Sequence, residues 1–334
     1  MTYEEVFKEL KQKIYKPIYF LQGEESYFID KISDYIAKNV LEESERDFNQ
    51  TVVYGRDTTV QDILNMAKRY PMMSEHQVII IKEAQDLSRS IESFSAYLEQ
   101  IMPSTILVFN YKYKKIDGRK ALGKELKKKG YLFSSDKVKD YKLPDWIIGY
   151  CKSEHLSINP RTAHILSEYL GNDLNKIANT LEKLKVVMDG DTEVTEELIQ
   201  KNVGISKEYN TFELNNALGE KDVLKANLIA NHFGQNPKNY PLVVTLGVVY
   251  GYFTKLIKFH QYTGQVDDRT LAQKMGVHPF ILKEYQKAAR NYNMNKIARV
   301  FGYLRQYDLA SKGVDNASTT DGELLKELVY KILH

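Results

Sequence analysis

Up to about residue 140, short apolar runs alternate with amphipathic segments. The clearest run is 78–81, four consecutive β-branched residues, which is typical of a strand buried on both faces of a parallel sheet. The expected strands are 18–21, 48–54, 78–81, 106–109 and 131–133, and the expected helices are 28–41, 59–69, 91–102 and 118–129. Strands separated by helices predict a mostly parallel sheet with helices on both faces.

Beyond about residue 140 the strand signals stop and apolar positions recur with helical spacing. Pro144 and Asn159-Pro160 open helices, Gly171 ends one, and further apolar stripes run to the C-terminal residues. The sequence therefore predicts an α/β domain at 1–140 and helical domains at 141–210 and 211–334. The most apolar window, 242–259, is interrupted by two lysines, so we expect a buried helix rather than a membrane span.

The segment before the 78–81 strand has an unusual composition. Thr59 and Asp62 predict a capped helix start, and Pro71 is expected to break that helix. Two adjacent methionines, Met72 and Met73, follow. They fit either a core or an exposed, adaptable contact for a partner protein. Two neighbouring side chains in a short turn cannot easily both face inward.

The turn after the first strand occupies the place of a nucleotide-binding phosphate loop. That motif needs a second glycine, a lysine and a hydroxyl, and counting from Gly23 these positions hold Phe28, Ile29 and Asp30. After the 78–81 strand, where an Asp-Glu pair often helps to hold Mg²⁺, the chain has Lys82-Glu83. Both patterns predict a degenerate nucleotide site that does not bind ATP.

A basic cluster follows the fourth expected strand. Its candidate DNA-contacting members are Lys114, Lys115, Arg119 and Lys120, and it continues from Lys112 to Lys129. Such a cluster is either a solvated helix face or a sequence-independent contact with a phosphate backbone.

Composition excludes several classes of protein. The chain has 334 residues with 43% hydrophobic and 27% charged residues, which is ordinary for a globular protein, and a net charge of +3. The single cysteine, Cys151, excludes a disulfide framework and a cysteine-based zinc site, and suits the reducing cytoplasm. No histidine spacing or catalytic motif indicates a metal, a cofactor or an active site.

Several stretches, in their order and spacing over nearly the whole chain, resemble the delta-subunit family of the bacterial DNA polymerase III clamp loader. Residues 17–29 are similar to the family's opening strand and non-functional phosphate loop, and residues 71–79 to the segment that enters the sliding clamp. Further similar stretches are 181–184 in the lid, 211–218 at the start of the third domain, and 308–313 with Leu324-Leu325 near the end.

This resemblance implies an AAA+-like sheet domain, a helical lid and a helical collar used for oligomerisation. It implies binding of the beta sliding clamp and opening of the ring for loading on primed DNA during replication, without binding or hydrolysing ATP. The family inserts two adjacent apolar side chains into the clamp, and those positions match Met72 and Met73, flanked here by Tyr70 and Pro71.

The implied partners are the clamp, the ATP-hydrolysing loader subunits and delta-prime in a hetero-pentamer, and DNA within that assembly. The implied location is the cytoplasmic, nucleoid-associated replisome, with no membrane. The chain would belong to a DNA-directed DNA polymerase holoenzyme, a nucleotidyltransferase, without a catalytic site of its own. The rival interpretations are an active AAA+ ATPase of replication, a DNA-binding accessory protein, and a structural helical adaptor.

Overall fold

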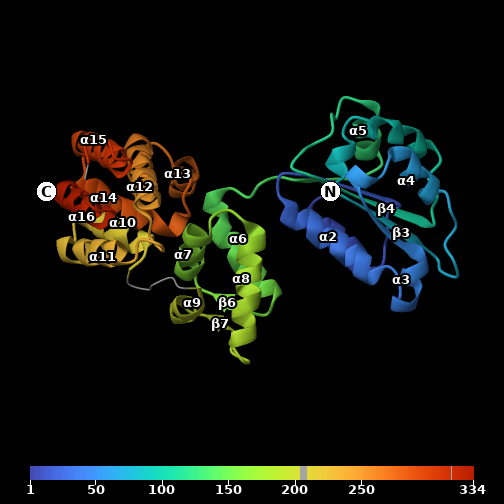
Figure 1. Cartoon of the computed structure of the whole chain (residues 1–334), viewed down its shortest axis with the longest axis horizontal. Coiled ribbons are helices and arrows are strands. Elements are labelled where there is room, and N and C mark those ends of the chain that lie inside the picture. Colours follow the sequence, from blue (N-terminus) through green and yellow to red (C-terminus); the bar gives the residue numbers. More distant parts are fainter. Residues whose placement is uncertain (204–208, 317) are drawn as a thin grey trace. The chain divides into compact units, whose positions relative to one another are not determined.

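The computed structural model describes residues 1–203, 209–316 and 318–334. They form two compact units, Met1–Val138 and Lys139–His334, coloured blue to green and green to red in Figure 1. The predicted division of the second unit at residue 210 stays a prediction, and residues 204–208 beside it lie outside the described residues.

The first unit is built on a five-stranded sheet in the order β2-β3-β4-β1-β5, in which all neighbouring strands are parallel. The strands are β1 (Ile18–Gly23), β2 (Gln50–Tyr54), β3 (Gln77–Lys82), β4 (Thr105–Lys112) and β5 (Leu132–Ser135). Because they are parallel, the carboxyl ends of β1, β3 and β4 meet at one edge and their amino ends at the other. This confirms the predicted α/β class.

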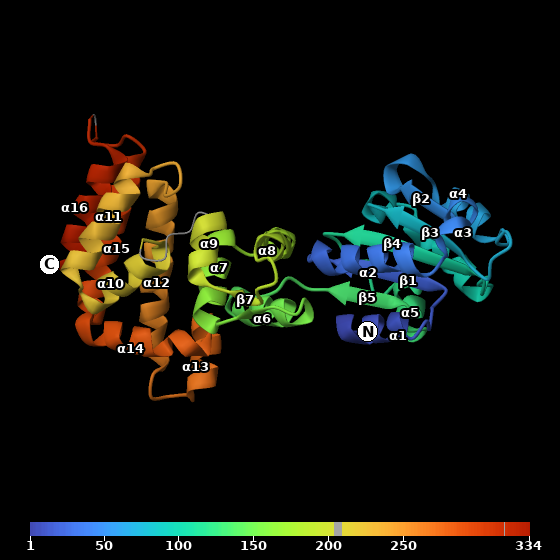
Figure 2. The same ribbon diagram turned by 90° about the horizontal axis from the view of Figure 1, so that it is seen from below.

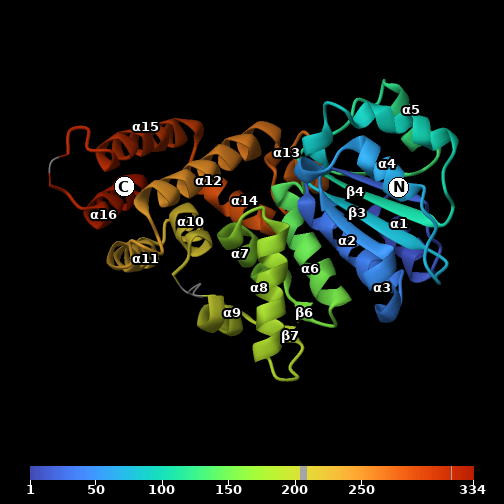
Figure 3. The same ribbon diagram turned by 45° about the vertical axis from the view of Figure 1, so that its right-hand side comes forward.

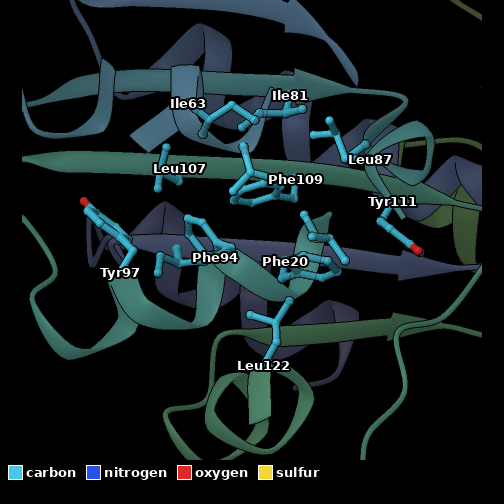
Figure 4. Packing of buried hydrophobic residues seen from close by; sticks show 14 of the residues in the cluster. Phe20, Ile63, Ile81, Leu87, Phe94, Tyr97, Leu107, Phe109, Tyr111 and Leu122 are labelled. Carbon is cyan, nitrogen blue, oxygen red and sulfur yellow. The ribbon is translucent and has the colours of Figure 1, made fainter. Parts of the chain in front are cut away.

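Helices cover both faces of this sheet (Figure 1). One face packs on α1 (Tyr3–Lys11) and α2 (Ser26–Asn39). The other packs on α4 (Val60–Ala67), the 3₁₀ helix Ile91–Glu99 and α5 (Ala121–Lys128). Alternate residues of the strands point to opposite faces of the sheet and so enter two different hydrophobic cores. Phe20, Ile81, Leu107 and Phe109 enter the core on the second face (Figure 4).

Three local predictions were wrong. The second strand begins at Gln50, because Glu42 and Glu45 form a capping box that starts a helix, α3 (Glu43–Asn49). The helix expected at 91–102 is a 3₁₀ helix that ends earlier, at Glu99. Helix α4 begins at the predicted Thr59 cap but ends at Ala67, so Pro71 lies beyond its end and does not break it.

The second unit is helical apart from a small parallel pair of strands, β6 (Ser157–Ile158) and β7 (Glu193–Val194), which the expectation of a strand-free region missed. Its helices α11, α15 and α16 pack together (Figure 2). The helices are α6 (Leu143–Ser153), α7 (Pro160–Leu170), α8 (Leu174–Val187), α9 (Glu196–Val203), α10 (Thr211–Glu220), α11 (Val223–Gln235), α12 (Leu242–Tyr262), α13 (Asp268–Met275), α14 (Leu282–Asn291), α15 (Met294–Ser311) and α16 (Asp321–Leu333).

Helix α12 is long and apolar enough to cross a membrane by length and composition alone. In the structure it packs against α10, α13, α14 and α15 (Figure 3). Its residues Leu246, Val249, Phe253, Leu256 and Phe259 are buried there. It is a core helix, as the sequence predicts.

Candidate functional site at the two edges of the sheet

The loop between α4 and β3 exposes apolar side chains at the amino-end edge of the sheet. Met72 is 62% exposed, Met73 is fully exposed and Tyr70 is 79% exposed, whereas Pro71 is half-buried. Both methionines therefore face solvent and neither fills the core. We call residues 70–73 the apolar knob.

A buried asparagine holds the backbone of the apolar knob. Asn49, the last residue of α3, is 4% exposed. Its Oδ1 accepts from the Met72 N–H at 2.6 Å, and its Nδ2 donates to the Met72 carbonyl at 2.9 Å. The Asn49 amide thus bonds to both backbone polar groups of Met72. The Met72 side chain takes no part in these bonds.

A second buried amide fixes the start of the same loop. Gln77 lies at the amino end of β3, and its Nε2 donates to the carbonyls of Met66 and Arg69 and to Thr105 Oγ1. Thr105 in turn donates to the Ala67 carbonyl at 2.8 Å. These bonds take up carbonyls at the end of α4, which has no further helical turn to use them.

Sequence reasoning missed Asn49, which it placed near the start of the strand expected at 48–54. Met73 has φ +53°, in the left-handed region that non-glycine residues seldom adopt. The loop therefore has a defined backbone conformation.

The degenerate nucleotide site lies at the opposite edge, where β1, β3 and β4 end. Helix α2 begins there, and phosphate groups bind at such helix N-termini in nucleotide-binding proteins. In this chain the buried carboxylate of Glu25 accepts from the Tyr27 N–H at 3.3 Å. An internal anion therefore already occupies the N-terminus of α2.

The three motif positions of the site have other roles. Phe28 packs between the rings of Tyr3 and Tyr27, with centroids 4.8 and 5.4 Å away. Ile29 is fully buried in the core. Asp30 accepts from Lys112 Nζ at 2.8 Å.

Lys112 forms ion pairs with the two acidic residues of the site, Asp30 and Glu83. Its ammonium, 15% exposed, lies 2.8 Å from Asp30 and 3.4 Å from Glu83, and Glu83 follows Lys82 at the end of β3. Burial lowers the pKa of Lys112, but hydrogen bonds and charge from Asp30 and Glu83 outweigh this and raise it. The sequence analysis counted Lys112 with the basic cluster, whereas the structure places it inside the degenerate site.

Gly23 keeps a structural task at this edge. Its φ is +129°, and a Cβ built on it would lie 1.9 Å from the Ser135 carbonyl oxygen of the neighbouring β5. The close approach of β1 and β5, rather than a phosphate, requires glycine here.

The basic cluster is divided by the structure. Lys115 forms an ion pair with Asp136, and Arg119 forms a bidentate pair with Asp117 at 3.0 Å. Within the described part of the chain, Lys114 and Lys120 are exposed and have no ion pair. The exposed lysines 124 and 127–129 of α5 lie further along the same stretch.

Comparison with known proteins matches most of the chain. The family model for "DNA polymerase III, delta subunit" matches residues 19–135, and the model for its C-terminal domain matches residues 208–329. DNA polymerase III subunit delta of Bacillus subtilis is 23% identical over 97% of this chain and 94% of its own length.

Solved structures give the same picture of the fold. The Bacillus subtilis DNA clamp loader delta protein is 22% identical, covers 99% of each chain and superposes with a TM-score of 0.60. The RuvB Holliday junction branch migration motor of Thermotoga maritima is 14% identical, with 86% of this chain and 87% of that chain covered and a TM-score of 0.37. This chain therefore shares the fold of the clamp loader delta protein.

Proposed function

The chain belongs to the family of DNA polymerase III delta subunits, subunits of the clamp loader of DNA replication, and from this premise we propose that it binds and opens the beta sliding clamp through Met72 and Met73. The observation that carries the proposal is the apolar knob: two neighbouring methionine side chains in solvent, on a backbone held by buried Asn49. Tyr70 and Pro71 flank them and extend the same contact.

Methionine suits such a contact, because its flexible, polarisable side chain adapts to an apolar pocket. Burying both side chains in a partner supplies about 3–6 kcal/mol of gross transfer free energy. The hydrogen bonds to Met72 reduce the ordering cost of association, since the loop is already fixed.

Ring opening needs no chemistry in this subunit. A protein that binds the open clamp interface better than the closed one shifts the ring toward opening by that difference in affinity. We propose that the degenerate site binds and hydrolyses no ATP, because buried Ile29 stands where the motif needs a lysine, Glu25 accepts from the N-terminal turn of α2, and Lys112 pairs with Asp30 and Glu83.

As a clamp-loader subunit the chain acts with other loader subunits. We propose that these are the ATP-hydrolysing subunits and delta-prime in a hetero-pentamer at the cytoplasmic replisome. Lys114 and Lys120 are the proposed DNA contacts within that assembly, since Lys115 and Arg119 are already paired with acids. A few lysines give only weak binding to DNA by the isolated chain, whereas tight, steeply salt-dependent binding to duplex DNA would support the rival interpretation of a DNA-binding protein.

The test is the affinity for the sliding clamp of the same organism, measured for the wild type and for Met72→Ala/Met73→Ala. We expect the double variant to lose about 2 kcal/mol or more, the scale of an interface hot spot. Met294→Ala is the matched control, because Met294 is also an exposed methionine, 51% exposed, but lies in the second unit.

Unchanged clamp binding by the double variant would overturn the site assignment while leaving the family intact. Absence of clamp binding by the wild type would overturn the proposed function. Titration with a fluorescent ATP analogue and Mg²⁺ tests the rival interpretation of an active ATPase, and saturable binding would support that rival.

A further inference from the structure

A cavity of about 120 Å³ lies in the second unit, away from the sheet. Four elements enclose it: α7, α10, α12 and the segment that runs into α14. Its size exceeds that of one water molecule, whose share of liquid volume is about 30 Å³. None of the proposed clamp, nucleotide or DNA contacts lines it.

The polar lining of this cavity is rich in hydrogen-bond acceptors. Asn215 is 9% exposed, and its Oδ1 has no hydrogen-bond partner among the described residues. Glu168 and Glu284 bring carboxyl groups from α7 and α14. A buried acceptor without a donor costs about 1–3 kcal/mol, so the site is incomplete without a donor.

The charges around Glu284 support this description. Burial, with smaller contributions from Glu213 and Glu220, raises the pKa of Glu284 to about 7, against the opposing charges of Arg161 and Lys287. Burial also lowers the pKa of His164, which lies 3.9 Å from Glu168. At neutral pH the histidine therefore supplies little positive charge to these acids, and Lys255 is the cation that lines the cavity.

Aromatic side chains form the remaining walls. Tyr252 and Tyr285 stack on each other with centroids 5.0 Å apart, and Phe212 lies on the α10 side. Aromatic faces attract organic cations, and a planar guanidinium also bonds to carboxylates through two parallel N–H groups.

We propose that this cavity binds a small organic cation carrying a guanidinium group, held by Glu168, Glu284 and the Asn215 carbonyl against the aromatic wall. The bound cation contacts α7 together with α10, α12 and α14, so it stabilises the packing of α7 on the C-terminal helices. The inference is independent of clamp binding.

Gly251 on α12 offers a way to fill the cavity without disturbing the core. It lines the cavity, and a Cβ built on it meets no atom within 4 Å among the described residues. Gly247, one turn earlier on the same helix, is equally unobstructed but does not line the cavity. Leucine at either position favours the helix over glycine, so both variants are expected to fold.

The experiment is ligand-observed NMR titration of the full chain with millimolar methylguanidinium, and with N-methylurea as the uncharged analogue. We expect methylguanidinium to bind and N-methylurea not to bind. Gly251→Leu should weaken methylguanidinium binding about tenfold or more, equal to about 1.4 kcal/mol. Gly247→Leu should leave it unchanged, and Glu284→Gln should weaken it.

A Gly-Arg-Gly peptide distinguishes a free compound from an arginine of a protein partner. We expect the peptide to bind more weakly than methylguanidinium, since its backbone does not fit a cavity of this size. Tighter peptide binding would overturn the free-compound assignment. No methylguanidinium binding by the wild type, or equal binding by Gly251→Leu and wild type, would overturn the site.

Discussion

The loops at the two ends of strand β3 differ in which of their side chains are exposed and which are paired. At the amino end, buried Asn49 holds the backbone so that Met72 and Met73 project into solvent. At the carboxyl end, the side chains of Lys112 and Glu83 form an ion pair with each other. Both loops contain a non-glycine residue with positive φ, Met73 at +53° and Glu83 at +51°.

The difference separates an exposed apolar surface from a site whose charged side chains pair with one another. At the amino end, the backbone N–H and carbonyl of Met72 are hydrogen-bonded, whereas the side chains of Met72 and Met73 are exposed. At the carboxyl end, Lys112 pairs with Asp30 and with Glu83. Under the proposed function, the contact with the partner lies at the amino-end edge of the sheet.

The largest effect is expected at Gly23, whose role at the carboxyl end is structural. Gly23→Ala places a Cβ against the Ser135 carbonyl and strains a φ of +129°, so we expect a loss of about 3 kcal/mol or more in unfolding free energy. Urea unfolding measures it. Gly118→Ala is the control, because its Cβ meets no described atom within 4 Å. Equal stability of the two variants would contradict the packing role.

The next effect concerns the anchor of the apolar knob. Asn49→Ala leaves the Met72 N–H and carbonyl without their partner and should reduce stability by about 2 kcal/mol. It should also weaken clamp binding, although Asn49 is buried and its side chain touches no partner directly. Asn65→Ala is the control, because Asn65 is exposed and its side chain accepts a hydrogen bond from Gln61 of the same helix. A stability loss with unchanged clamp affinity would show that the anchor does not position the knob.

A smaller effect is expected at Lys112. Lys112→Met keeps the apolar stem but removes the cation between Asp30 and Glu83, which are both partly exposed, so we expect a loss of about 1 kcal/mol in urea unfolding. Adding Asp30→Asn should recover part of that loss. Lys114→Met, at the exposed neighbouring lysine, should change little. ATP binding by Lys112→Met would show that the lysine alone closes the site, contrary to the roles of Glu25 and Ile29.

Features that depend on residues close together in the sequence could be predicted, whereas contacts between residues far apart in the sequence could not. The β-branched run of β3 and the capping box of Thr59 and Asp62 are local signals, and both predictions were confirmed. The second strand was confirmed as β2, but its expected start at Phe48 was wrong, because the helix that begins at the capping box of Glu42 and Glu45 runs through Asn49. The sequence showed at Phe28 and Ile29 that the nucleotide motif is lost. It did not show which side-chain contacts take the place of the nucleotide contacts.

The replacements are contacts between residues far apart in the chain. Lys112 meets Asp30 across the sheet edge, and Asn49 at the end of α3 bonds to Met72, which follows α4. No periodicity or motif spacing encodes such pairs, because they depend on strand order and register. The exposure of the two methionines likewise follows from where α4 ends, at Ala67, which the sequence placed too late.

The smallest stability effect is expected at Met73, and it separates the fold from the contact. Met73→Gly relieves the positive φ but adds freedom to the unfolded chain, so the two terms nearly cancel and unfolding free energy should change by no more than about 0.5 kcal/mol. Clamp affinity should nevertheless fall, because a fully exposed side chain has been removed. Parallel urea unfolding and clamp titration give both quantities. A variant with unchanged stability and unchanged clamp affinity would mean that Met72 carries the contact alone. A variant with lost stability would mean that the Met73 side chain supports the loop, and the contrast between the two ends of β3 would no longer hold.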